Sequence, residues 1–248
     1  MSLLNSIQSD ASVDTSDKDV LGGRTLLATN LYEGKIEAAW LSASAQGAIA
    51  FNYIAKIGAT SLRQTVYITN KDKQDFFVDK KTQEKKIMPG AAQINSLVKL
   101  LTGKNSLKEL GTESRVLSLY DYDAKKEMPT KVDAFVDLHG RAVLFAVENQ
   151  IVDKSVKGGD GKYVASGETR EQNEITKFFD ADTRQTATEK AGAATAEFAT
   201  KWLEKNADKV IDKESKESKA LRASGNVVKT GLPSNSAPAP AAADIFGD

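Results

Sequence analysis

The sequence predicts a mainly β fold with added helices, between a flexible N-terminal arm and a flexible C-terminal tail. Three observations support this prediction. Apolar and polar residues alternate with a period of two along much of the chain, one amphipathic helical pattern interrupts this alternation, and both ends are poor in large apolar residues. Turn residues separate the alternating runs, which is typical of antiparallel sheets.

The alternation defines the strands. Between residues 49 and 57 the odd positions are apolar, and in the first strand the even positions, including Trp40, are apolar while the odd positions are charged. In the third strand Arg63 and Tyr67 point away from the apolar face. The expected strands are Leu31–Leu41, Ile49–Ile57, Leu62–Ile68, Phe76–Asp79, Val116–Tyr122, Val132–Leu138 and Ala142–Ile151.

Two helices are expected. After Pro89 and Gly90, apolar residues recur at helical spacing from Ile94 to Leu101, and Gly103 ends the pattern. A second helix is expected over residues 186–222. Several strands with one helix inserted midway indicate a β-barrel that is OB-fold-like, and a β-sandwich is the alternative.

The two ends of the chain differ from its middle. Residues 1–23 carry four aspartates against one lysine, and residues 223–248 hold three of the five prolines among many small residues. Such compositions bury little apolar surface. We therefore expect a flexible arm over 1–23, a folded domain over 24–185, the helix over 186–222 and a disordered Ala/Pro-rich linker over 223–248.

The composition excludes several kinds of site. The chain has no cysteine and one histidine, so disulfides, thiolate metal sites and multi-histidine zinc sites are impossible, and we expect no cofactor. The apolar run from Ala142 to Val147 is too short to span a membrane, and the N-terminus lacks a signal-peptide pattern. The sequence thus predicts a soluble, intracellular protein with no membrane partner.

The balance of 34 basic and 34 acidic residues conceals a basic middle. Residues 61–110 contain ten lysines and arginines against five acids, and two phenylalanines lie between two lysine clusters. Lysines attract phosphates, and exposed rings stack on unpaired bases. The predicted contacts with single-stranded DNA are Arg63, Tyr67, Lys71, Lys73, Phe76, Phe77, Lys80, Lys81, Lys85 and Lys86.

The same residues have a simpler interpretation. Lysines on a hairpin commonly keep a sheet edge from aggregating. Of two adjacent phenylalanines in a strand one points inward, so at most one of Phe76 and Phe77 can stack on a base. Phe135 is a second stacking candidate because it faces away from its apolar neighbours. Four other aromatic residues are expected in the core: Trp40, Tyr120, Tyr122 and Trp202.

Two blocks of sequence resemble a known family. Residues Val66–Asn70 and Phe76–Gly90, with the helix that follows them, are similar to the replication single-stranded DNA-binding proteins of tailed bacteriophages, also called helix-destabilising proteins. Residues Glu148–Lys154, Gly167–Glu171 and Asn173–Ile175 continue the resemblance, which covers roughly residues 25 to 185.

The resemblance implies a function and a set of partners. It implies a non-enzymatic OB-fold protein that coats single-stranded DNA during phage replication and recombination, in the cytoplasm of the infected bacterial host. It also implies that the C-terminal tail recruits replication enzymes such as the polymerase, primase or helicase, through Asp244, Ile245, Phe246 and Asp248. The tail departs from the family pattern because it has few acids and does not end in its aromatic residue. Self-association is left open.

Other motifs do not point to catalysis. The segment Lys157–Tyr163 lacks the first glycine and the Ser or Thr of a phosphate-binding P-loop. His139 precedes Gly140 in an expected turn, where a structural role is commoner than that of a catalytic base. Four aspartates on separate strands could hold Mg²⁺ if the fold brought them together: Asp121, Asp123, Asp133 and Asp137. The rival functions are therefore a metal-dependent phage nuclease and a scaffold protein.

Overall fold

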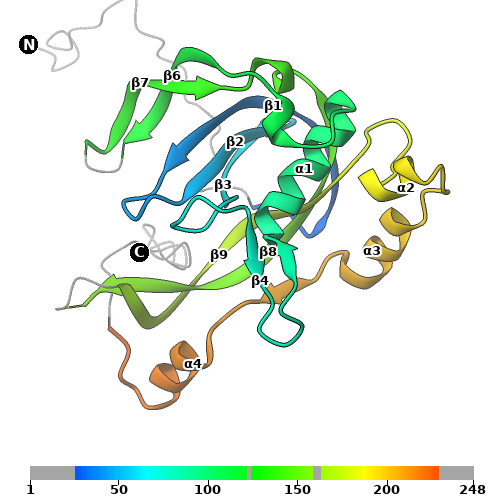
Figure 1. The fold of residues 1–248 in the computed structure, drawn as a ribbon. Helices are drawn as coiled ribbons and strands as arrows, with labels where there is room; N and C mark the ends of the chain where they lie inside the picture. The colour runs from blue at the N-terminus through cyan, green and yellow to red at the C-terminus, as the bar shows by residue number, and fades with distance from the viewer. Residues whose placement is uncertain (1–25, 122–123, 159–162, 229–248) are drawn as a thin grey trace, which may run out of the picture.

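The protein is built on one large, mostly antiparallel sheet, as the sequence predicts. The computed structural model describes residues 26–121, 124–158 and 163–228, with 46% strand and 21% helix (Figure 1). The strands are β1 (Asn30–Ala43), β2 (Ile49–Ile57), β3 (Thr60–Tyr67), β4 (Phe76–Val78), β5 (Lys85–Ile87), β6 (Glu113–Asp121), β7 (Lys126–Ala134), β8 (Ala142–Lys157), β9 (Tyr163–Phe179) and β10 (Val210–Asp212). The helices are α1 (Pro89–Thr102), α2 (Ala187–Ala191), α3 (Phe198–Asn206) and α4 (Lys216–Ala223), with short 3₁₀ helices η2 (Leu107–Glu109) and η3 (Val136–Leu138).

The strands β1, β2 and β3 form an antiparallel meander. In β2 the residues Phe51 and Tyr53 are fully buried in the core, as the alternation predicts. The pairing of β1 with β2 shifts by one residue between Ile36 and Ala38. This bulge keeps Ile36 on the core face but moves Trp40 to the opposite face, because a bulge resets the alternation beyond it.

The longest strands, β8 and β9, pair with each other from Leu144 and Phe179 to Lys157 and Tyr163. The other edge of β8 pairs antiparallel with β1 and, beyond the end of β1, parallel with β10. The strand β9 is not among the strands expected from the sequence.

Two hairpins extend from this sheet. The β6–β7 arm (residues 113–134) is joined to β1 at its base, where Ala134 lies opposite Trp40. The β4–β5 hairpin (residues 76–87) forms a separate two-stranded sheet. In Figure 1 the arm lies at the upper left and the hairpin at the lower centre, so the two are well separated in this view.

Helix α1 lies between β3 and β9, which share no backbone pairing within the described residues, so the sheet does not close by its own ladder. The Gln64 side chain of β3 accepts a hydrogen bond from the Ile175 amide of β9 at 3.1 Å, and Gln93 of α1 donates to the Ile175 carbonyl at 3.0 Å. A Cβ atom on Gly90 would lie 2.2 Å from the Tyr67 carbonyl oxygen. Only glycine allows this close approach of α1 to β3.

The sheet has apolar residues packed on both faces. The larger cluster joins α1 to the inner face of the meander and includes Phe51, Ile94, Leu97 and Phe145. A smaller cluster on the other face packs α3, through Trp202, against β8 and Phe179. The expectation of a core position for Trp202 is therefore confirmed.

The single helix expected over residues 186–222 is instead three short helices and the strand β10. The break after α2 has a local cause. The Glu189 carboxylate accepts hydrogen bonds from the Thr186 amide, within a capping box at the start of α2, and from the Glu197 and Phe198 amides at the start of α3. One side chain thus caps two helices and fixes the turn between them.

No helix within the described residues is long and apolar enough to cross a membrane.

A glutamate pair lies at the centre of the β8–β9 ladder. Glu148 and Glu174 are directly opposite in register. Burial raises the pKa of Glu174, the Gln64 hydrogen bond lowers it, the Glu148 charge raises it and the Lys213 charge lowers it, with a net increase. A carboxyl with a raised pKa in the folded state costs stability where it is charged, so this cost grows as pH rises through the raised pKa.

We expect Glu174→Gln to stabilise the protein at pH 7 by about 0.2–1 kcal/mol, the usual size of a like-charge cross-strand term. The gain should shrink towards pH 4, where the wild-type carboxyl becomes protonated. Urea denaturation at the two pH values measures both quantities, with Glu204→Gln on α3 as the matched control. A gain that is equal at both pH values would contradict the charge explanation.

Candidate nucleic-acid interface

The outer face of the meander is the face of β1, β2 and β3 that points away from α1. Arg63 and Tyr67 lie on this face of β3, and Tyr67 is 52% exposed. Between them Thr65 donates to the Asn52 side chain at 2.7 Å, and Asn52 donates to Ser42 at 2.8 Å. This polar ladder crosses three strands and fixes side chains between the two predicted contact residues.

Trp40 also belongs to the outer face, which the sequence did not predict. Its ring is only 2% exposed, but the Arg63 guanidinium lies 5.3 Å from the ring centroid. The ring orients the cation on the exposed face of the sheet through a cation–π contact. The expectation that Trp40 is buried is confirmed, yet it does not join the main core cluster around α1.

A groove with a volume of about 530 Å³ lies beside Trp40 and Arg63. Its other wall is the β6–β7 arm, which contributes Lys131 and Thr130 among others. Lys131 was not among the residues predicted to bind DNA, because the sequence pattern marks it only as an exposed position. The pairing of β7 with the edge of β1 places it in the groove.

The turn after β3 carries Lys71 and Lys73. The Asn70 side chain accepts hydrogen bonds from the Asp72 and Gln74 amides, which folds this turn back towards the β1–β2 turn. A Cβ on Gly47 of that turn would lie 3.3 Å from the Lys71 carbonyl oxygen. Lys71 and Lys73 are exposed and form no ion pair with any described residue. They extend the positive charge of Arg63 past the end of β3.

The β4–β5 hairpin holds the other predicted residues at some distance from this face. Phe76 is half-buried, with the Lys85 ammonium 4.9 Å from its ring centroid, whereas Phe77 is 43% exposed. Phe77 is therefore the better placed of the two rings for stacking. Lys86 contacts the Asp79 carboxylate at 2.6 Å, and this hydrogen bond lowers the pKa of Asp79.

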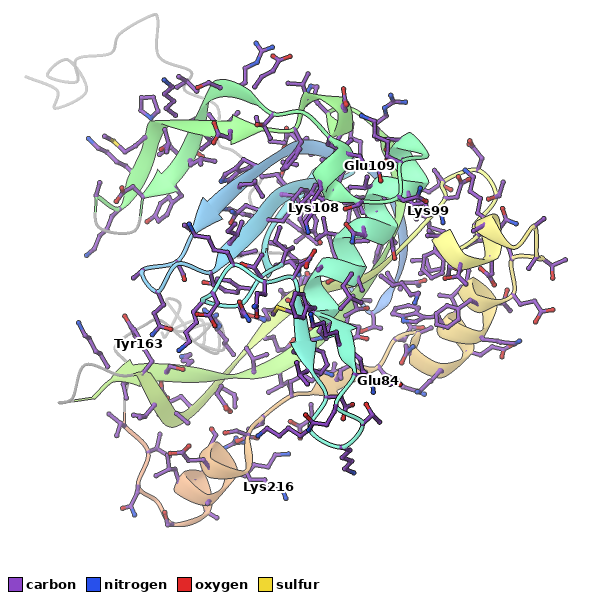
Figure 2. The ribbon with its side chains drawn as sticks, in the orientation of Figure 1. Glu84, Lys99, Lys108, Glu109, Tyr163 and Lys216 are labelled. Carbon is purple, nitrogen blue, oxygen red and sulfur yellow. The ribbon has the colours of Figure 1, made fainter. Side chains whose placement is uncertain are left out.

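The tip of the hairpin carries Lys80 and Lys81, which are exposed and have no ion-pair partner among the described residues. Figure 2 labels Glu84 near this tip, well separated from Tyr163 at the start of β9. The predicted residues thus form two groups. Arg63, Tyr67 and Lys71 lie along the meander, and the hairpin residues form a second basic surface below it.

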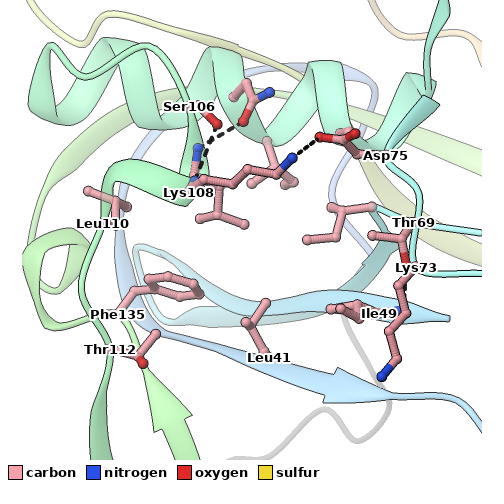
Figure 3. Close-up of a pocket in the computed structure, with 15 residues that line it drawn as sticks. Leu41, Ile49, Thr69, Lys73, Asp75, Ser106, Lys108, Leu110, Thr112 and Phe135 are labelled. Atoms are coloured by element: carbon pink, nitrogen blue, oxygen red, sulfur yellow. Dashed lines mark hydrogen bonds and ion pairs between the residues drawn. The ribbon is translucent and has the colours of Figure 1, made fainter. Parts of the chain in front are cut away.

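An apolar pocket of about 280 Å³ opens beside Lys73, between α1, η2 and the ends of β1 and β2 (Figure 3). Lys108 lies at its rim, where its ammonium contacts Asp75 at 2.7 Å, and this hydrogen bond lowers the pKa of Asp75. The deeper lining is aliphatic or aromatic, and Asn95 is already used as the acceptor for the Leu107 amide. A nucleobase has polar edges that this lining would leave unsatisfied, so the pocket is a poor base site.

Two aromatic expectations need correction. Phe135 is 3% exposed, with its ring centroid 5.5 Å from that of Phe51, so it is a core residue and cannot stack on DNA. The chain leaves β7 at Ala134 and turns into η3, which rotates Phe135 inward. Tyr120, expected in the core, is exposed on the β6–β7 arm. Tyr122 lies outside the described residues.

The remaining candidates do not form a catalytic group. The His139 Nδ1 atom lies 2.5 Å from the Glu37 carbonyl oxygen, a contact that requires a proton on Nδ1 and joins the histidine to the β1 bulge. Asp137 contacts Lys104 at 3.6 Å, and Asp121 and Asp133 are on β6 and β7. Among the residues described, no three acidic or histidine side chains gather to hold a metal ion.

Several sequence predictions fall on residues that the structure does not describe. These are the arm 1–23, Asp123, part of the glycine-rich segment 157–163, and the tail residues Asp244, Ile245, Phe246 and Asp248. Comparisons of the chain with protein-family models, with curated proteins and with solved structures return no match.

Proposed function

We propose that this protein binds single-stranded DNA without sequence preference and coats it during phage replication and recombination. The observation that carries the proposal is the arrangement on the outer face of the meander. An exposed tyrosine, Tyr67, and an arginine held on a tryptophan ring, Arg63 on Trp40, follow one strand of an open face. Stacking on a ring favours any unpaired base, and phosphates favour any nearby cation.

The geometry suggests a path for the strand. DNA would enter the groove between the β6–β7 arm and β1, where Arg63 and Lys131 are available to phosphates. It would then pass Tyr67, on which a base stacks, and leave over the turn that carries Lys71 and Lys73. The basic β4–β5 hairpin, with Phe77, Lys80 and Lys81, would contact a longer strand beyond this turn.

An OB-type barrel is part of the same proposal. The strands lie side by side in the order β3–β2–β1–β8–β9, which is the order expected for that barrel. Along the chain α1 comes between β3 and β8, where an OB-type barrel has its helix. The Gln64 and Gln93 contacts with Ile175 would bridge β3 and β9 where no ladder joins them. OB-type barrels bind oligonucleotides on the face of their second and third strands, which is where Arg63 and Tyr67 lie.

The proposed role is non-enzymatic, in the host cytoplasm. We further propose that Asp244, Ile245, Phe246 and Asp248 bind a replication enzyme such as the polymerase, primase or helicase, since an acidic–apolar tip complements a basic, apolar pocket. This part depends on the resemblance and on the composition of the tail.

One titration tests the function. A fluorescent oligo-dT strand is titrated with the full chain at low and high salt, with and without Mg²⁺. We expect tight binding that weakens steeply with salt, equal affinity for mixed-sequence strands, weaker binding to duplex, and an intact oligonucleotide. Binding that ignores salt would overturn the proposal, and Mg²⁺-dependent cleavage would favour the nuclease instead. No affinity at all would favour a scaffold.

The two basic surfaces can be ranked by their effect on the salt dependence. Each phosphate contact with a single strand contributes about 0.7 to the slope of log affinity against log salt. For a short oligonucleotide we expect the double variant Lys71→Ala/Lys73→Ala to reduce the slope by this amount per lost contact. The matched control, Lys80→Ala/Lys81→Ala at the hairpin tip, is expected to change it less. The reverse ranking would move the main contact to the hairpin.

A further inference from the structure

The β6–β7 arm has an open edge. All nine residues of β6 pair with β7 in regular register, and no other strand of the described chain pairs with β6. The strand contains no proline or bulge, two of the devices that commonly prevent the edge of a sheet from pairing with another chain, and its charged residues are of both signs. In Figure 1 the arm projects from the body of the molecule.

The arm also exposes a contiguous apolar surface. Val116 is 65% exposed and Tyr120 is 46% exposed, and the alternation puts both on the same face of β6. Pro129, opposite Ser118 on β7, lies between them on that face. Scattered exposed apolar residues are ordinary, but a grouped set beside an open strand edge is typical of an interaction surface.

We propose that a second copy of this chain pairs with β6 in antiparallel orientation, with the two-fold axis at Ser118. The two arms would then form one four-stranded sheet. In this register Arg115 lies opposite the partner's Asp121, and Val116 lies opposite the partner's Tyr120. Each of these pairs occurs twice because the contact is symmetric.

The charges favour this register over the one with its axis one residue earlier. Moving the axis to Leu117 would bring Glu113 opposite the partner's Asp121, and like charges directly opposite destabilise a sheet. With the axis at Ser118, Arg115 and Asp121 form two pairs of opposite charge, and an aromatic ring meets a β-branched side chain between them. Both kinds of cross-strand pair are favourable.

Arg115 and Asp121 remain suitable for these contacts. Arg115 contacts Glu113 at 2.5 Å, but more than half of each side chain is exposed, and such surface pairs contribute little. Asp121 accepts a hydrogen bond from the Ala124 amide at 2.8 Å, which leaves the charge of its carboxylate in place. The proposed contact places an opposite charge of the partner beside each of these two side chains.

Sedimentation velocity of the full chain without DNA tests the proposal. We expect the wild type to show a concentration-dependent monomer–dimer equilibrium on the order of micromolar, since the contact is smaller than a standard interface. Arg115→Glu and Asp121→Lys should each weaken dimer formation at least about tenfold, because each replaces two attractions by two repulsions. An equimolar mixture of the two variants should dimerise as the wild type does.

The mixture is the decisive sample. In the mixed dimer one Arg115–Asp121 contact is kept, and the other becomes a contact between the introduced glutamate and the introduced lysine. Both pairs therefore have opposite charges. Asp121→Asn keeps an oxygen acceptor for Ala124 and should weaken dimer formation by a smaller factor, which separates charge from turn geometry. Arg184→Glu, in a remote exposed turn, serves as the control and should behave as the wild type. A monomeric wild type, or folded variants whose mixture stays monomeric, would overturn the proposal. It does not depend on DNA binding.

Discussion

Replacing Tyr67 by alanine is expected to weaken binding of single-stranded DNA by about 1–3 kcal/mol, or roughly 5- to 150-fold. Tyr67 is the most exposed ring of the outer face, and it lies between Arg63 and the Lys71 turn. Its loss would remove a base-stacking surface and leave the nearby cations in place. Fluorescence titration at fixed salt measures the loss, and the salt slope should stay close to that of the wild type.

Tyr67→Phe is the matched control for this prediction, because it keeps the ring and removes only the hydroxyl group. It should bind within about twofold of the wild type if stacking is what matters. Since Tyr67 is half-exposed, neither variant should lose much stability, and urea denaturation checks this. An alanine variant that binds as well as the wild type would exclude Tyr67 from the interface and favour Phe77 on the β4–β5 hairpin.

Replacing Phe51 by alanine is expected to lower the free energy of unfolding by about 3–5 kcal/mol, the usual cost for a buried phenylalanine. The Phe51 ring is fully buried on β2, and its centroid lies 6.0 Å from that of Tyr53 and 5.5 Å from that of Phe135. The change would leave a cavity at the junction of the meander and η3. Small domains have a total stability of about 5–15 kcal/mol, so this variant is expected to be marginal.

Urea denaturation of the Phe51→Ala variant measures this loss directly, with Phe51→Leu as the conservative comparison. The leucine variant fills most of the volume and should lose clearly less stability than the alanine variant. A loss below about 1 kcal/mol for alanine would mean that the site collapses without cost, contrary to the packing described.

The strands with clean alternation could be predicted from sequence. In β2 the fully buried set of Phe51, Tyr53 and Ala55 follows the pattern, because side chains of a strand alternate between the apolar core face and the outer face every two residues. Helix α1 could also be predicted from the sequence. Gly103 ends it with a φ of 74°, a left-handed conformation that glycine adopts easily. The tight contact of Gly90 with β3 could not be predicted, because it depends on how α1 packs on that strand in three dimensions.

Three features of the fold were not predicted from the sequence, each for a physical reason. The bulge at Ile36–Ala38 moved Trp40 to the outer face, and one extra residue in a strand leaves no signature in composition. The strand β9 was not predicted because its residues 168–174 are all polar or charged, so this stretch shows no alternation of apolar and polar positions. Residues 186–222 were predicted as one helix because most of them individually favour helices. The hydrogen bonds of Glu189 to the starts of α2 and α3 instead divide this segment after α2.

The candidate site was also predicted from the sequence only in part. Exposure of Arg63 and Tyr67 on one face of β3 followed from alternation alone, and the structure adds the tryptophan beneath Arg63. The separation of the β4–β5 hairpin from the meander could not be inferred, because ten nearby positions in sequence do not define one surface. Lys131 joined the groove only through a contact between β7 and β1.

The unequal cover of the sheet has a consequence for how amide hydrogens exchange with solvent. The paired segments of β1 and β8 carry an apolar cluster on each face, so their amides are expected to exchange only when the whole fold opens. The β4–β5 and β6–β7 hairpins contribute no residue of 76–87 or 113–133 to either cluster and should exchange by local opening. The β4–β5 hairpin, proposed to contact a longer DNA strand, and the β6–β7 arm, proposed to pair with a second copy, are thus expected to adjust without opening the rest of the fold.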